Sequence, residues 1–371
     1  MKPIVSFSDT PPPEGLGPKQ ETAKTVTATR QALNPSAQEA DQAHKSLRPK
    51  SFSQFIGQTQ TCKNLDTFIK AAQARKKPLD HVLLSGPPGL GKTSLAGIIA
   101  AEMGGQFRLT SGASINRVGE LAAILTNLAP FDVLCIDEIH RLPKAIEEIL
   151  YPPLEDGKLD LVVGDGPAAR TVRLTLSPFT LVAATTRQGL LSRPLRDRFG
   201  IHAEVAFYKP SELAEIILQA ADAEHTPLSH DMALFLGERS RGTPRIALRL
   251  LRRLIDFAMV EGTQQKNGNL KTQKSLNQLG ITFAQQALHR LGIDKAGLDT
   301  LDRRYLQALS KQFNGGPVGI DTLAAALFEE KQTLEDVVEP FLIQQGFIKR
   351  TPQGRVLEKG VLKDLCLENV G

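Results

Sequence analysis

Short apolar runs alternate with helical hydrophobic patterns from about residue 46 to residue 208. The apolar runs cover residues 81–84, 107–110, 133–136 and 179–184. Each run is short enough to be a buried strand, and strands that alternate with helices are typical of a parallel sheet with helices on both faces. The pattern therefore predicts an α/β domain over residues 46–208.

A helical pattern without strands follows and predicts a small all-helical domain over residues 209–281. One helix is expected to begin near Glu212, with Ser211 as its N-cap. Another is expected to begin at Pro244, because proline suits the first turn of a helix. The stretch 262–277 is rich in Gln, Asn, Lys and Gly and is expected to be a surface loop.

The remaining chain, residues 282–371, shows three amphipathic segments followed by a hairpin pattern. The helices are expected at residues 301–313, 320–328 and 333–345, the last with Thr333 as its N-cap. The hairpin is expected from two β-prone segments, 346–350 and 355–357, around a turn at 351–354. Three helices and a β-hairpin are the plan of a winged helix.

The first 45 residues show neither the helical nor the strand pattern of hydrophobic positions. They are rich in Pro, Gly, Thr, Gln and Ser, which predicts a disordered tail. The predicted organisation is therefore a tail, an α/β domain, a helical domain and a winged helix, over residues 1–45, 46–208, 209–281 and 282–371. No internal repeat is visible.

Composition narrows the class of protein. The 371 residues are 41% hydrophobic and 23% charged, which is ordinary for a globular protein, and the net charge of +5 fits a nucleic-acid partner. No apolar run approaches the roughly 20 residues that span a bilayer, so no membrane segment is expected. The three cysteines are far apart, which argues against a disulfide framework and favours a cytoplasmic location.

Residues 85–94, Ser-Gly-Pro-Pro-Gly-Leu-Gly-Lys-Thr-Ser, lie between a predicted strand and a predicted helix. In that context the sequence G-x-x-x-x-G-K-T is a phosphate-binding loop, whose glycines let backbone N–H groups approach phosphate oxygens. Lys92 would reach the β- and γ-phosphates, and the Thr93 hydroxyl would ligate Mg²⁺. The alternative is an ordinary glycine-rich turn. The motif predicts binding of a nucleoside triphosphate such as ATP.

Two acids follow the apolar run 131–136. A carboxylate at the carboxyl end of a parallel strand lies at the edge of the sheet where ligands bind. There Asp137 could hold Mg²⁺, and Glu138 could orient the attacking water and accept its proton. The alternative is a pair of solvated acids, but the complete phosphate loop upstream favours hydrolysis.

Three further positions suit an ATPase. Residues 185–187, Thr-Thr-Arg, end a predicted strand, where a hydroxyl could contact the γ-phosphate or the water. Arg198 could stabilise the negative charge that develops during phosphoryl transfer in the site of a neighbouring subunit. It could equally lie at the end of a basic surface helix. Arg245 opens a helix in the all-helical domain, where it could report the state of the γ-phosphate through a hinge movement.

Two hairpins could contact partners. Within residues 157–176, two β-prone runs flank Gly164-Asp165-Gly166, and Leu161 and Val163 could form an exposed apolar patch; a packed hairpin is the alternative. In the winged helix, Lys349, Arg350 and Arg355 flank the turn. Cations there would bind DNA phosphates without reading sequence, unless the hairpin is simply a solvated basic one.

Together these motifs resemble the AAA+ ATPases and, among them, the RuvB family of bacterial Holliday-junction branch-migration motors. The resemblance covers roughly residues 46–357. It depends on long strings at residues 47–50, 137–142, 166–170, 194–200, 242–247 and 315–319. It implies a homohexameric ring that translocates duplex DNA at four-way junctions during recombination and repair, with RuvA holding the junction and RuvC cleaving it.

The resemblance also implies roles for individual residues. Leu47 and Arg48 would contact the adenine side, and phosphate contacts would come from Gly89, Lys92, Thr93 and Ser94. Thr185 would be the first sensor, Arg198 the finger that enters the neighbouring site, and Arg245 the second sensor. Further nucleotide-site positions are Glu155, Asp156, Gly157 and Tyr208. Arg350 and Arg355 would contact DNA, and the hairpin 157–176 would dock RuvA.

Two other classes of protein compete with this interpretation. A clamp-loader subunit could share the motor core, but a carboxyl-terminal winged helix with a basic wing fits it poorly. A winged-helix regulator with a nucleotide switch is the second alternative. The complete Asp137-Glu138 pair argues against it, because a switch does not need rapid hydrolysis.

Overall fold

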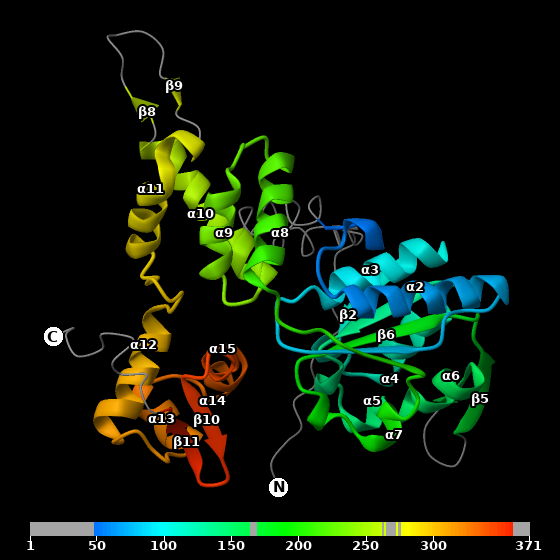
Figure 1. Ribbon diagram of the computed structural model, residues 1–371. Helices are drawn as coiled ribbons and strands as arrows, with labels where there is room; N and C mark the ends of the chain where they lie inside the picture. The colour runs from blue at the N-terminus through cyan, green and yellow to red at the C-terminus, as the bar shows by residue number, and fades with distance from the viewer. Residues whose placement is uncertain (1–47, 164–168, 262, 265–271, 274–275, 359–371) are drawn as a thin grey trace, which may run out of the picture. The chain divides into compact units, whose positions relative to one another are not determined.

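The computed structural model describes residues 48–163, 169–261, 263–264, 272–273 and 276–358 (Figure 1). The described residues from Pro49 onward belong to one compact unit. The predicted tail, Leu47 and the turn at 164–166 lie outside the described residues.

A five-stranded parallel sheet, in the order β2-β3-β6-β1-β7, forms the centre of the first part of the chain. The strands are β1 (Val82–Ser85), β2 (Phe107–Ser111), β3 (Val133–Asp137), β6 (Thr180–Thr185) and β7 (Ile201–Glu204). The four predicted strands are therefore present. Strand β7, which pairs with β1 at the edge of the sheet, was not predicted.

The two faces of the sheet are packed by different helices (Figure 1). Helices α2 (Thr59–Ala74) and α3 (Lys92–Met103) cover one face, where Val82 and Leu84 belong to the same hydrophobic cluster as Leu65 and Leu95. Leu83, between them on β1, points to the other face and packs with Leu121 and Leu125 of α4 (Val118–Thr126). Successive residues of β1 thus point to opposite faces of the sheet. Because both faces are buried, the strand is apolar almost without interruption.

Shorter elements connect these strands and helices. The chain forms 3₁₀ turns at Phe52–Gln54, Gly112–Ser114, Ile139–Arg141 and Gln188–Leu190. It also forms helices α5 (Lys144–Ile149), α6 (Tyr151–Asp156) and α7 (Arg193–Arg196). The predicted hairpin is present as β4 (Lys158–Val163) paired with β5 (Arg170–Thr175) in an antiparallel register.

The described helices of the next part are α8 (Pro210–Ala223), α9 (His230–Glu238), α10 (Pro244–Glu261) and α11 (Leu276–Arg290), the last with a kink at Gly280. Pro244 begins α10 as predicted. Ser211 as an N-cap was wrong: α8 begins at Pro210 and Lys209 is the N-cap residue, because proline fits the first helical position. The end of the predicted loop 262–277 was also wrong, since α11 begins at the buried Leu276. Short strands β8 (Thr263–Gln264) and β9 (Thr272–Gln273) pair within that stretch.

The last part is a winged helix. Helix α12 (Thr300–Gln307), continued by a π turn at Ala308–Gln312, packs with α13 (Ile320–Leu327) and α15 (Glu339–Gln344) around Tyr305 and Leu306. Thr333 as an N-cap was wrong, because α14 (Lys331–Thr333) already begins at Lys331 and runs into a π turn at Leu334–Val338. Strands β10 (Ile348–Thr351) and β11 (Gly354–Leu357) form the wing.

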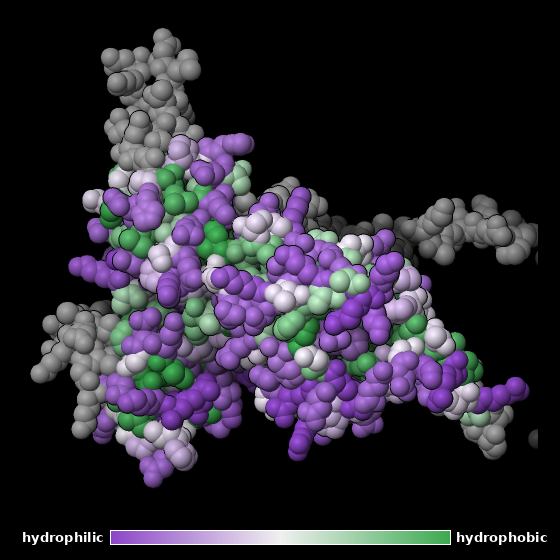
Figure 2. Space-filling model, turned by 45° about the vertical axis from the view of Figure 1, so that its right-hand side comes forward, coloured by the Kyte–Doolittle hydropathy of each residue, from purple (hydrophilic) through white to green (hydrophobic). Residues whose placement is uncertain are grey.

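The face in Figure 2 is largely hydrophilic, with small separate apolar areas. Among the described helices, none combines the length and apolar composition needed to cross a membrane.

Candidate active site

The phosphate loop joins β1 to α3 through a backbone that only glycine tolerates. Gly86 has φ +138°, and a Cβ atom there would lie 2.3 Å from the Val205 carbonyl oxygen. Gly91, at the N-cap of α3, has φ 97° in the left-handed region. The first-turn N–H groups of the 12-residue helix α3 are thereby directed at the loop, which suits phosphate.

Lys92 is held inside this loop. Its side chain is 6% exposed, and Nζ donates to the carbonyl oxygens of Gly86 at 2.7 Å and Pro87 at 2.8 Å. Burial lowers the pKa of Lys92 to about 8, although Glu138 and Asp137 oppose the shift. The loop thus provides a desolvated cation at the place where phosphate oxygens would bind.

Thr93 and Asp137 meet at the end of β3. The Thr93 hydroxyl donates to Asp137 Oδ2 at 3.4 Å, although the two residues are 44 positions apart in sequence. A hydroxyl and a carboxylate are the oxygen donors that Mg²⁺ takes together with nucleotide phosphates. The donor set therefore fits Mg²⁺.

Glu138 occupies an unusual backbone position with several partners. Its φ is 49°, in the left-handed region that non-glycine residues rarely adopt. The Thr186 hydroxyl donates to Glu138 Oε2 at 3.0 Å, and His140 Nδ1 lies 3.2 Å from the same oxygen. Gly112 packs against its backbone, since a Cβ there would lie 2.5 Å from the Glu138 carbonyl oxygen. The carboxylate is thereby fixed from two sides.

Thr185 is fully buried at the end of β6. Its hydroxyl lies 2.9 Å from His140 Nδ1 and accepts a hydrogen bond from the Arg187 N–H at 3.0 Å. Burial lowers the pKa of His140, while the charge of Glu138 opposes that shift. His140 therefore links Thr185 to Glu138.

Thr186 and His140 are the residues that the sequence analysis did not select. Thr186 was visible only as the second hydroxyl of the Thr-Thr pair, and His140 only as part of a matching string. Their contacts with Glu138 join segments up to 48 positions apart. The one available signal was the close spacing of His140 to the acidic pair.

Tyr208 and Arg245 bring the helical domain to the phosphate loop. The buried Tyr208 hydroxyl donates to the Leu90 carbonyl at 3.1 Å, and its backbone N–H donates to Gly242 at 2.9 Å. The backbone N–H of Arg245 donates to the Gly89 carbonyl at 3.3 Å. The structure therefore brings together Gly89, Lys92, Thr93, Asp137, Glu138, Thr185, Tyr208 and Arg245. Ser94 lies beside Thr93 in the first turn of α3 and is half-buried.

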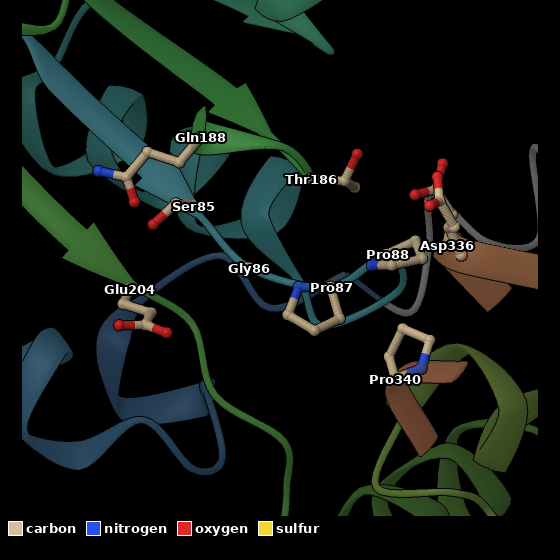
Figure 3. A pocket seen from close by; sticks show the side chains of 10 residues that line it. Ser85, Gly86, Pro87, Pro88, Thr186, Gln188, Glu204, Asp336 and Pro340 are labelled. Carbon is tan, nitrogen blue, oxygen red and sulfur yellow. The ribbon is translucent and has the colours of Figure 1, made fainter. Parts of the chain in front are cut away.

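A cavity of about 270 Å³ opens beside the loop (Figure 3). Ser85, Gly86, Pro87 and Pro88 line one side, with Thr186, Gln188 and Glu204 from the neighbouring strand ends. Glu335, Asp336 and Pro340 of the winged helix line it as well. The phosphate loop is therefore accessible from a cavity that both polar and apolar residues line.

Arg198, Glu155 and Gly157 form a separate group. Arg198 Nη2 lies 2.9 Å from Glu155 Oε1, and its guanidinium covers the Tyr151 ring at 4.2 Å. Arg198 and Gly157 line a second cavity of about 390 Å³ with Pro153, Leu154 and Phe179, among others, and Asp156 is the exposed last residue of α6. None of the residues that line this second cavity belongs to the phosphate loop. Arg48 is exposed at the first described position.

The hairpin β4–β5 has one apolar face that continues from the core. Leu159 is buried, Leu161 is half-buried against the core, and Val172, directly opposite Leu161, is 41% exposed. The expected patch is thus only partly exposed at Leu161 and includes Val172, which the sequence analysis passed over. The side chain of Val163 is outside the described part of the structure.

Arg350 and Arg355 lie directly opposite each other on the wing. Arg350 is 47% exposed, but Arg355 is only 14% exposed. Both contact the carboxylate of the buried Glu339. The alternative of a simply solvated basic hairpin therefore does not hold for Arg355, which is paired with a buried carboxylate.

A phosphate loop, an Asp-Glu pair at the end of the central strand, and a helical domain that touches the loop define a P-loop ATPase of the AAA+ class. Three family models match the chain. They are the Holliday junction DNA helicase RuvB P-loop domain at residues 47–205, the RuvB AAA lid domain at residues 208–282, and the RuvB C-terminal winged helix domain at residues 295–365.

Similar proteins agree with these models. The chain is 54% identical over 330 residues to the Holliday junction branch migration complex subunit RuvB of Paramagnetospirillum magneticum, covering 89% of this chain and 91% of that relative. The protein of the same name from Granulibacter bethesdensis is 55% identical over 94% of this chain and 92% of its own length. The solved Thermotoga maritima RuvB Holliday junction branch migration motor superposes with a TM-score of 0.76 at 44% identity, covering 86% and 98% of the two chains. The chain belongs to the RuvB family.

Proposed function

We propose that this chain is an ATP-driven DNA translocase that moves Holliday junctions during recombination and repair. The observation that carries the proposal is the convergence of Lys92, Thr93, Asp137 and Glu138 at one edge of the sheet, in a chain that ends in a winged helix with a basic wing. Membership of the RuvB family supports the same function.

ATP binding begins at the phosphate loop. The β- and γ-phosphates take the place of the Gly86 and Pro87 carbonyls as partners of Lys92 Nζ. Thr93 and Asp137 hold Mg²⁺, which supplies charge neutralisation on the phosphate oxygens when it is bound. Gly89 and Ser94 contribute backbone and hydroxyl donors, and Leu47 with Arg48 contacts the adenine side.

Hydrolysis depends on the restrained carboxylate. Glu138 orients the attacking water and accepts its proton. Thr185 is the first sensor, and its hydroxyl communicates with Glu138 through His140. Arg245 is the second sensor, because a shift of the loop at Gly89 moves the start of α10 directly. Tyr208 contacts both the loop and Gly242, and stabilises that hinge.

A second subunit completes the site. Arg198 pairs with Glu155 beside Gly157 and lines a cavity distinct from the one beside the loop, which supports a role in the neighbouring site. In a homohexameric ring, Arg198 acts as the arginine finger, and Glu155, Asp156 and Gly157 face the same neighbouring nucleotide. Each site is then built by two subunits.

The partners follow from the two hairpins. The apolar residues Leu161 and Val163 dock RuvA, and RuvC joins the same complex at the four-way junction. Arg350 and Arg355 contact the phosphate backbone of duplex DNA without reading bases. The complex acts in the cytoplasm, where the bacterial chromosome lies.

Movement of a synthetic four-way junction, with ATP, Mg²⁺ and RuvA present, tests the proposal. The wild-type chain should move the junction only with ATP, and Glu138→Gln should bind ATP without moving it. Full branch migration by Glu138→Gln would overturn the catalytic assignment. ATP hydrolysis without junction movement would overturn the translocase assignment.

A further inference from the structure

The wing brings two cations face to face. Arg350 and Arg355 are directly paired residues of β10 and β11, and like charges at such positions repel each other. A hairpin with this pair needs a counter-charge. The structure supplies two carboxylates, Glu339 and Glu335, with different burial.

Glu339 is the permanent counter-charge. It is fully buried, and it accepts hydrogen bonds from Arg350 Nε at 2.6 Å, Arg355 Nε at 2.9 Å and the Tyr305 hydroxyl at 3.0 Å. Removing such a carboxylate from its partners would leave a buried charge uncompensated. DNA therefore cannot displace Glu339.

Glu335 differs in being reachable from solvent. Its side chain is 26% exposed, and Oε1 accepts a hydrogen bond from Arg355 Nη2 at 3.1 Å. A carboxylate and a phosphate present the same kind of oxygen acceptor to a guanidinium group. Glu335 therefore occupies the face of Arg355 that a phosphate would use.

The two carboxylates also cancel the positive charge of the two arginines. Two arginines and two carboxylates sum to zero, so the wing presents little net positive charge while both carboxylates are paired. Partly exposed ion pairs are weak enough to be exchanged for a competing anion. Of the two arginines, Arg350, at 47% exposure, is then the one open to DNA from the start.

We propose that Glu335 is an internal competitor for DNA, which sets the affinity of the wing by occupying Arg355 until a backbone phosphate displaces it. This inference depends on the proposed function, because it takes Arg350 and Arg355 as the DNA contacts. A translocating motor must release each phosphate that it grips. An internal carboxylate that re-pairs with Arg355 lowers the cost of that release.

Glu335→Gln in the full-length chain tests the inference. Binding to a labelled duplex should tighten by about twofold to fivefold, the range expected for losing one partly exposed ion-pair competitor. The slope of log K against log salt should steepen by up to about 0.9, because the phosphate that engages Arg355 releases its condensed cation and no freed Glu335 carboxylate takes up a cation in return. A side chain with only a structural role would move thermal stability but not this slope.

Asp336→Asn is the matched control. Asp336 lies next to Glu335 and pairs with Arg187 Nη2 at 2.8 Å, whereas Glu335 is 3.7 Å from the same atom. The control removes one negative charge from the same turn and weakens the Arg187 contact, but it leaves Arg355 paired. Its salt slope should equal that of the wild-type chain.

The outcomes separate this inference from the function. If the salt slope steepened equally in Glu335→Gln and Asp336→Asn, the inference would be overturned, because the loss of one negative charge from the turn would explain both results. Unchanged or weaker binding of Glu335→Gln would also overturn it, provided that Arg350→Ala with Arg355→Ala weakens binding and flattens the slope. If the double arginine variant binds like wild type, the DNA contacts of the proposed function fail instead.

Discussion

The Thr186 hydroxyl donates a hydrogen bond to Glu138 Oε2 at 3.0 Å, across 48 positions of sequence. The residue that follows the buried end of β6 therefore restrains the side chain expected to activate water. His140 Nδ1 lies 3.2 Å from the same oxygen. The orientation of the carboxylate thus depends on the ends of β3 and β6 and on the 3₁₀ turn Ile139–Arg141 that follows β3.

Thr186→Val should lower kcat for ATP by about fivefold to tenfold, because a misoriented general base loses part of its contribution of 10²–10⁴. The KM for ATP should change little, since Thr186 contacts the carboxylate and not the loop. Steady-state ATPase assays measure both constants. Thr175→Val, on the exposed strand β5, is the control. An unchanged kcat in Thr186→Val would show that the hydrogen bond does not orient Glu138.

Gly112→Ala should strongly lower the rate of ATP hydrolysis, although it adds only one methyl group. The added Cβ would lie 2.5 Å from the Glu138 carbonyl oxygen, so the backbone at Glu138 must shift. A misplacement of that kind costs on the order of 10²-fold in rate. Gly119→Ala, in α4 with nothing within 4 Å of its Cβ, is the control and should stabilise the protein by about 0.5–1 kcal/mol. Equal ATPase rates in the two variants would contradict the prediction.

His81 should make the protein sensitive to acid. Its Nδ1 accepts the Leu181 N–H at 2.9 Å, and burial lowers the pKa to about 4 from 6.5. The unfolded chain therefore binds the proton first as pH falls, and stability is lost between pH 6.5 and 4, by at most about 3 kcal/mol. Urea unfolding at several pH values measures this. His81→Asn, which can keep an acceptor, should flatten the curve over that range; the same slope in both proteins would exclude His81 as its source.

Val172→Asp should abolish binding of RuvA while leaving ATPase activity intact. Val172 is exposed, and a charge there interrupts the apolar face that continues from Leu161. Thr171→Asp, on the opposite face of the same strand, is the matched control, because neighbouring residues of a strand point to opposite sides. Pull-down with purified RuvA separates the two. Retention of RuvA by Val172→Asp would move the docking surface elsewhere.

Local patterns were enough to predict much of this structure. The loop 86–93 depends on glycines and a lysine within one strand-turn-helix unit, and its context was readable from neighbouring residues. The central strands were readable because they are apolar on both faces. Strand β7 was missed, because an edge strand of four residues with alternating burial has little signal of its own.

Contacts between distant segments were beyond the sequence. Nothing near Thr186 indicates that its hydroxyl meets Glu138. Nor does a basic hairpin reveal that Arg355 is 14% exposed against a buried glutamate from α15. Those facts depend on tertiary packing. The wrong N-caps at Ser211 and Thr333 have a local cause instead, because the helices already begin at Pro210 and Lys331.

The base of the hairpin β4–β5 is closed by one hydrogen bond, in which the Leu176 N–H donates to the Gly157 carbonyl at 2.8 Å. The two ends of the insertion are therefore neighbours. Leu159 and Leu174 near its base pack in the same hydrophobic cluster as the sheet, whereas Arg170 and Thr171 farther out are exposed. The outer part of such an insertion is modular. Segments of other lengths or specificities could be grafted between Leu161 and Val172, so that the same motor would be recruited to a different adaptor.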